Sequence, residues 1–137
     1  MATTIDAISE HIVRCIERAD WETLADCYAP DVLLDVDLPA WRFQLQGREV
    51  VRAYLVEHTG GLRNLRCTHH RSHLVATGLI VEEEMRFDED EGESLWRAVD
   101  IFHVVGDAVV EHDQYCTGTW TPADVRRQAA EAPMLRW

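Results

Sequence analysis

Residues 95–117 read LWRAVDIFHVVGDAVVEHDQYCT, which is two alternating segments joined by Gly106-Asp107. Alternation of apolar and polar side chains over this length predicts strands, because successive side chains of a strand point to opposite faces. A Gly-Asp pair between two such segments is typical of a tight hairpin turn. We therefore predict an antiparallel hairpin of residues 95–105 and 108–117.

The rest of the chain continues the same pattern toward the N-terminus. Apolar residues at helical or alternating spacing predict the other elements. Strands are expected at 31–38, 65–76 and 79–87, a solvated acidic hairpin tip at 88–93, and helices at 4–28 (interrupted at 19–21), 47–58 and 122–132. This order predicts an α+β fold with three N-terminal helices packed on a strongly curved, mostly antiparallel sheet. We expect a single domain over residues 1–137, with its core at about 4–117 and a helical tail at 120–137.

Composition limits the partners and the chemistry. The chain has 25 acidic residues against 13 basic ones, all arginine, and a net charge of −12. An acidic surface repels phosphate groups, so neither nucleic acid nor a membrane is an expected partner. No stretch approaches the ~20 apolar residues of a membrane span, and no signal segment precedes the first helix, so we expect a cytoplasmic protein. The four dispersed cysteines are expected to be buried free thiols.

Three segments together resemble the nuclear transport factor 2-like superfamily. They are ADWETL with YAPDV at residues 19–24 and 28–32, LQGREVVRAYL at 45–55, and VDIFHVVGDAVVEH at 99–112. The last is similar to the final hairpin of SnoaL-like polyketide cyclases. The resemblance implies a cone-shaped, cystatin-like fold that encloses one blind pocket. Because ketosteroid isomerase, scytalone dehydratase and non-catalytic proteins share this fold, the pocket residues must decide the function.

Asp100 is the strongest catalytic candidate. Alternation puts it on the same strand face as Trp96, Ala98 and Phe102, which is apolar. Burial there would raise the pKa of the carboxyl group unless a donor compensates. The resemblance adds that the matching position of ketosteroid isomerase carries a protonated acid that donates to the substrate oxyanion. The alternative is an Asp100 that pairs with an arginine or a backbone amide inside the core.

His69 and Asp113 are the other two catalytic candidates. The segment RCTHH at 66–70 resembles the part of scytalone dehydratase that carries a catalytic histidine, and Asp113 matches the catalytic aspartate of SnoaL-like cyclases. Histidine titrates near neutral pH and suits proton transfer. His73 shares the strand face of His69 but lies roughly 13 Å away, too far for both to bind one metal ion. Surface or interface positions are the alternatives for all three.

The remaining pocket candidates are mostly aromatic. A flat apolar ligand suits such a lining. The expected pocket residues are Tyr28, Trp41, Tyr54, His73, Trp96, Phe102 and Asp35, the last of which lies near the position of the general base of ketosteroid isomerase.

Two functions fit these residues. The first is a cofactor-independent isomerase, cyclase or dehydratase that acts by general acid–base catalysis on a small apolar cyclic or polyketide-like molecule, with no metal ion. The second is a non-catalytic module of the same fold that binds a small molecule or dimerises. A homodimer is expected through the sheet face that carries Val99, Ile101, Val105, Ala108, Val110 and Cys116.

Overall fold

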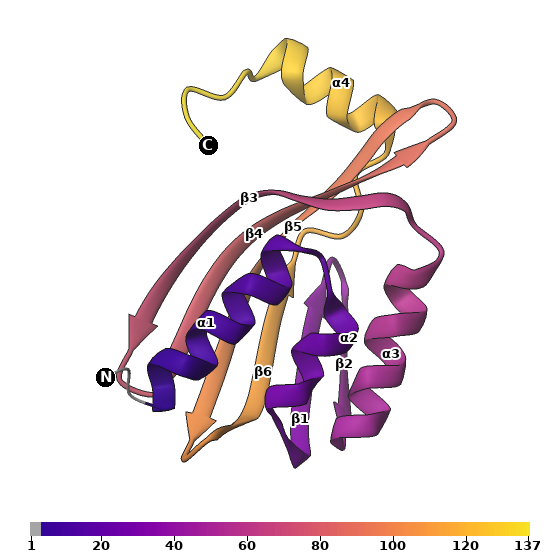
Figure 1. Ribbon diagram of the computed structural model, residues 1–137. Coiled ribbons are helices and arrows are strands. Elements are labelled where there is room, and N and C mark those ends of the chain that lie inside the picture. Colours follow the sequence, from indigo (N-terminus) through magenta and orange to yellow (C-terminus); the bar gives the residue numbers. More distant parts are fainter. Residues whose placement is uncertain (1–3) are drawn as a thin grey trace.

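The computed structural model describes residues 4–137 and has three helices packed against one face of a strongly curved sheet (Figure 1). In chain order the elements are α1 (Thr4–Glu17), α2 (Trp21–Leu24), a 3-10 turn (Ala25–Cys27), β1 (Tyr28–Leu38), β2 (Trp41–Gln46), α3 (Arg48–Gly60), β3 (Arg63–Val75), β4 (Gly78–Glu89), β5 (Gly92–Val105), β6 (Ala108–Cys116) and α4 (Pro122–Glu131). The α+β class and the predicted strands are confirmed, and each strand end lies within three residues of its expected position.

The helix order differs from the prediction in one respect. Strands β1 and β2 precede α3, so only α1 and α2 come before the sheet. The prediction missed β2 although its sequence, WRFQLQ, alternates apolar and polar residues over all six positions. Ala40 has a φ of 58°, which closes the tight turn that pairs Leu38 with Trp41. The sheet therefore begins with a hairpin that lies beneath α3.

The six strands lie in the order β2-β1-β6-β5-β4-β3. Only β1 and β6 run parallel, and every other neighbouring pair is antiparallel. Strand β4 ends at Glu89 and strand β5 begins at Gly92. The acidic turn between them is therefore shorter than the 88–93 stretch that we expected. Helix α4 packs at this tip, away from the other three helices (Figure 1), where Arg126 donates to the Glu91 carbonyl at 2.8 Å.

The core lies between the helices and the concave face of the sheet. Helix α1 buries Ile8, Ile12 and Ile16, which recur every four residues and so share one side of the helix. It ends at Glu17 because Ala19 takes a φ of 52°, and Asp20 then caps α2 by accepting from the Thr23 amide. The convex face of the sheet, called the outer face below, carries most of the charged strand residues.

No helix within the described residues is long and apolar enough to cross a membrane.

Candidate active site

A cavity of about 200 Å³ lies between the concave face of the sheet and helices α2 and α3. Its volume is below the roughly 300–1,000 Å³ of typical ligand pockets, so it suits a molecule of one or two rings. Most of the wall is apolar. The lining residues are Trp21, Val36, Leu38, Tyr54, Leu55, His58, Thr59, Trp96, Gln114, Cys116, Gly118 and Thr119.

His58 is the titratable group of the cavity best placed to move a proton. It comes from the last turns of α3, where its ring stacks on Tyr54 at 5.5 Å and lies 5.9 Å from the ring of Trp96. More than a third of the surface of His58 is exposed, at the edge of the cavity, and burial of the rest lowers the pKa of the imidazole, which is therefore neutral at pH 7. Its ring nitrogens have no hydrogen-bond partner among residues 4–137. A neutral, unpartnered imidazole in an apolar cavity can accept a proton from a bound molecule.

Trp21 lines the same cavity and carries a buried hydrogen-bond donor. Its side chain is 4% exposed and lines the wall, and its indole N–H has no partner within the described part of the chain. A buried donor without a partner costs free energy, which a ligand oxygen would recover by accepting from it.

Asp100 lies directly behind the cavity wall and is fully buried. Its Oδ1 accepts from His112 Nε2 at 2.7 Å and from Gln114 Nε2 at 2.9 Å, and Gln114 itself lines the cavity. On the far side of the imidazole, the Tyr28 hydroxyl lies 2.7 Å from His112 Nδ1. Burial holds the pKa of Tyr28 well above its usual value, so the hydroxyl keeps its proton, and the His112 imidazole bridges Tyr28 and Asp100 through its two ring nitrogens.

A second acid, Glu83, is buried on the same face of the sheet. It is 1% exposed, and its Oε1 accepts from the Trp96 indole N–H at 3.3 Å. Burial, followed by the negative charge of Asp100, raises the pKa of Glu83 well above its usual range. Two cavity residues, Gln114 and Trp96, thus each reach back to a buried acid.

The structure places the predicted aromatic residues at three depths. Tyr54 and Trp96 line the cavity. Tyr28 and Phe102 lie deeper in the core, and Phe102 stacks on the imidazole of His112 with ring centroids 4.2 Å apart. Trp41 is 67% exposed and lies at the start of β2, outside the cavity.

The structure does not bring His69, His73 or Asp35 to Asp100. His69 stacks on Trp137, with ring centroids 4.9 Å apart, and His73 lies 3.0 Å from Glu82 on the outer face. Asp35 is bound by the Arg42 guanidinium on the same face. The expected catalytic role of His69 beside Asp100 in one pocket is therefore not supported by its position: the register of β3 with β4 puts His69 opposite Glu84, whose side chain points away from the cavity.

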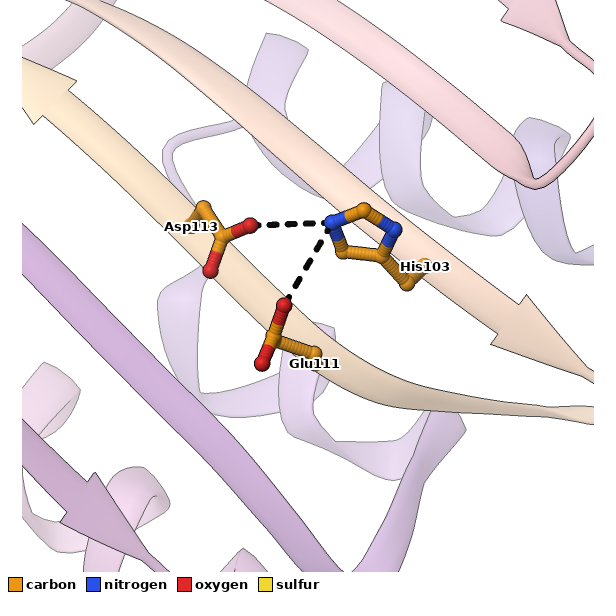
Figure 2. Close-up of side chains that lie close together, drawn as sticks. All are labelled: His103, Glu111 and Asp113. Carbon is orange, nitrogen blue, oxygen red and sulfur yellow. Dashed lines mark hydrogen bonds and ion pairs between the residues drawn. The ribbon is translucent and has the colours of Figure 1, made fainter.

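Asp113 also lies on the outer face. Its Oδ2 is 2.9 Å from the Nε2 of His103, which is 3.5 Å from the Oε2 of Glu111 (Figure 2). Because side chains alternate along β6, Asp113 points away from the concave face to which its neighbours His112 and Gln114 belong. It cannot act together with Asp100 across the thickness of the sheet.

Cys116, which we expected on the outer apolar face, lines the cavity. A shift of register between His103 and Val104 leaves Val110 without a partner on β5, which inverts the alternation along the rest of β6. The same inversion turns His112 and Gln114 inward. All four cysteines are free, as expected, and burial raises the pKa of Cys116 to about 11, so this thiol is not a nucleophile at neutral pH.

Comparison with known proteins identifies the fold and the family. The model of the SnoaL-like domain matches residues 9–112, which is most of the chain. The chain belongs to the SnoaL-like family. No curated protein sequence matches it significantly.

Solved structures similar to this SnoaL-like protein show the same fold at low sequence identity. One is an NTF2-like protein of unknown function from Cytophaga hutchinsonii, 14% identical over 82% of this chain and 98% of that one, with a TM-score of 0.66. A second, from Catenulispora acidiphila, has a ketosteroid isomerase-like fold and was solved with trimethylamine; it is 12% identical over 90% and 92% of the two chains, with a TM-score of 0.63. A third is a phenazine biosynthesis-related protein from Pseudomonas aeruginosa, 8% identical over 98% and 92%, with a TM-score of 0.65.

Proposed function

We propose that this SnoaL-like protein is a cofactor-independent enzyme that moves a proton next to a carbonyl group in a small, neutral, mostly apolar ring compound. The observation that carries the proposal is His58, a neutral imidazole without a hydrogen-bond partner in residues 4–137, in the wall of an apolar cavity. A group with these properties is suited to general base catalysis at neutral pH. Isomerisation, cyclisation or dehydration would each begin with this step.

The cavity also offers donors for the charge that develops. When His58 removes a proton from the carbon beside the carbonyl, negative charge moves to the carbonyl oxygen. Trp21 lines the same cavity, and we propose that its buried indole N–H, which has no partner in the described part of the chain, donates to that oxygen after a small movement of the ring. Gln114, which lines the cavity from strand β6, offers the oxygen a second polar contact. Hydrogen bonds of this kind stabilise an oxyanion most strongly where water is excluded.

Asp100 acts in this proposal as a positioning residue. It binds the Gln114 amide at 2.9 Å and does not itself line the cavity. His112 and Tyr28 in turn fix Asp100 through two further hydrogen bonds of 2.7 Å. The chain from Tyr28 to Gln114 therefore sets the direction of one amide in the wall, and groups held in this way keep a site rigid.

The alternative function is binding without catalysis. The contacts of Asp100 also fit this function. Its Oδ1 forms hydrogen bonds with two side chains and does not face the cavity, which is the usual arrangement of a buried structural carboxylate. The two functions differ in the role of His58. In a binding protein its ring only lines the cavity, whereas in an enzyme one of its ring nitrogens accepts a proton.

The test uses 1-tetralone, a neutral bicyclic ketone, as the probe. Binding is measured by NMR chemical-shift changes, and catalysis by the exchange of its α-protons for deuterium in D₂O. We expect binding by the wild type and by His58→Gln, with exchange reduced roughly 10²-fold or more in the variant. His73→Gln, on the outer face, is the matched control and should exchange at the wild-type rate. Binding without exchange above the buffer rate would establish the binding function, and failure to bind would contradict both.

A homodimer through the outer face is part of the same proposal. Val105 and Tyr115 are 68% and 55% exposed there, which is unusual for residues of their size on a monomer surface. Light scattering on the purified chain should give twice the chain mass. A charged residue in place of the half-buried Ile101, on the same face, should reduce it to the monomer mass.

A further inference from the structure

A second cluster of titratable side chains lies on the outer face, apart from the cavity. It consists of His103 from β5 and of Glu111 and Asp113 from β6 (Figure 2). His103 Nε2 lies 2.9 Å from Asp113 Oδ2 and 3.5 Å from Glu111 Oε2, and one ligand atom of each residue lies within 4.8 Å of the others. One imidazole nitrogen and two carboxylate oxygens thus converge on one point.

The strands hold this arrangement without help from a loop. His103 lies directly opposite Glu111 in the β5–β6 register, and Asp113 follows two residues later on the same face. The register shift just beyond His103 is what turns both acids outward together. Ligands placed on paired strands keep their geometry better than ligands on loops.

The two acids of this cluster differ from other acids on the outer face in their ion-pair partners. Glu82 pairs with Arg71, Glu84 with Arg86, and Asp35 with Arg42. Within residues 4–137, no arginine forms an ion pair with Glu111 or Asp113, and His103 is their one cationic partner. Two carboxylates held side by side repel each other, and a cation between them would relieve that repulsion.

We propose that His103, Glu111 and Asp113 form a binding site for a divalent first-row transition-metal ion, with Zn²⁺ as the probe. Imidazole nitrogen and carboxylate oxygen are ligands that zinc and its neighbours accept. Ligand atoms 2.0–2.2 Å from a tetrahedral ion lie roughly 3.4 Å apart. The observed separations of 2.9 Å and 3.5 Å lie on either side of that value, so small side-chain movements complete the site.

In the single chain the site is open to solvent, and it lies on the other side of the sheet from the cavity, on the same outer face as the proposed dimer contact. The side chains of His103, Glu111 and Asp113 are 34%, 38% and 20% exposed, which leaves room for water on the remaining coordination positions. Three protein ligands with an open fourth position are typical of zinc sites that take an exogenous ligand. Because these side chains and His58 lie on opposite faces of the sheet, failure of the proposed function would leave this site untouched, and the reverse also holds.

The experiment measures Zn²⁺ binding to the full chain by calorimetry, after removal of metal with EDTA and gel filtration. We expect one ion per chain. Loss of a residue that merely orients a metal ligand costs 10–100-fold in affinity, so His103→Ala and Asp113→Asn should each weaken binding at least about tenfold. His73→Ala is the matched control, since His73 contacts Glu82 on the same face in a cluster that Arg71 already neutralises.

Two further measurements separate binding at this site from unfolding of the variants and from zinc binding by thiols. Circular dichroism should show that both variants remain folded, as expected for substitutions of partly exposed side chains. With Co²⁺ in place of Zn²⁺, the absorption spectrum should lack the thiolate charge-transfer band, which separates this site from the four free cysteines. Wild-type affinity in both His103→Ala and Asp113→Asn, or a thiolate band in the spectrum, would overturn the proposal.

Discussion

Removal of a single oxygen atom, by the substitution Tyr28→Phe, tests the hydrogen-bond chain behind the cavity. The Tyr28 side chain is 2% exposed, and its hydroxyl contacts His112 Nδ1 at 2.7 Å. Phenylalanine fills the same space, so the substitution opens no sizeable cavity. It leaves the Nδ1 atom of a fully buried imidazole without a donor, and a buried polar atom without a partner costs about 1–3 kcal/mol. For a chain of this size, that corresponds to a decrease of roughly 3–12 °C in Tm.

Urea unfolding, followed by tryptophan fluorescence, measures the effect. The control is Tyr115→Phe, because Tyr115 is 55% exposed on the outer face and should change the unfolding free energy by less than about 0.5 kcal/mol. An unchanged m-value would show that the comparison concerns the same folded and unfolded states. If Tyr28→Phe were as stable as wild type, the hydroxyl would not be satisfying His112, and the hydrogen-bond chain from Tyr28 through His112 to Asp100 would lose its support.

Three other outcomes follow from the structure. Burial raises the pKa of Glu83, so the folded state keeps a proton that the unfolded chain releases as pH rises above about 4.3. The contribution of Glu83 to the unfolding free energy should therefore fall with rising pH. Denaturation curves of Glu83→Gln at several pH values should lack this contribution. Burial lowers the pKa of His58, so any exchange activity should be constant above about pH 6.5 and fall below the depressed pKa, whereas a profile centred above 7 would exclude His58 as the base. Gly78→Ala would place a Cβ 1.8 Å from the Phe102 carbonyl oxygen at a φ of +154° and should destabilise the fold by at least about 1–3 kcal/mol in urea, whereas Gly61→Ala, with open space around it, should not.

The inward position of Asp100 could be predicted from the sequence because it depends on alternation within one regular strand. The four residues on one face of β5, from Trp96 to Phe102, leave no freedom for a carboxylate between them to turn outward. The same rule failed on β6. There the register shift opposite His103 inserts Val110 and inverts the faces, so that His112 points inward and Cys116 lines the cavity. A bulge is one extra residue, and a single sequence contains no periodic signal for it.

The sequence prediction missed His58 for a different reason, although a signal is present. Val51, Tyr54, Leu55 and His58 stand at the i, i+3, i+4 and i+7 positions of α3 and so share the helix face that is turned to the core and the cavity, with Val51 and Leu55 buried and His58 exposed at its end. The prediction uses this histidine only as the end of the helix. Glu83 could be placed by alternation, because Glu82 and Glu84 share the outer face and Glu83 lies on the other one, between Val81 and Met85; its complete burial depends on the pairing of β4 with β5.

The distribution of charge also restricts what the cavity can bind. No arginine is among the residues that line it in the described part of the chain, and the nearest acids, Asp100 and Glu83, lie just behind Gln114 and Trp96. An anionic ligand would lose its hydration without gaining a positive partner, and it would face the charge of Asp100 in a medium of low dielectric constant. A neutral ketone meets neither cost. Its enolate would carry negative charge only while His58 holds the proton, so the imidazolium that catalysis creates is itself the counter-charge that the cavity otherwise lacks.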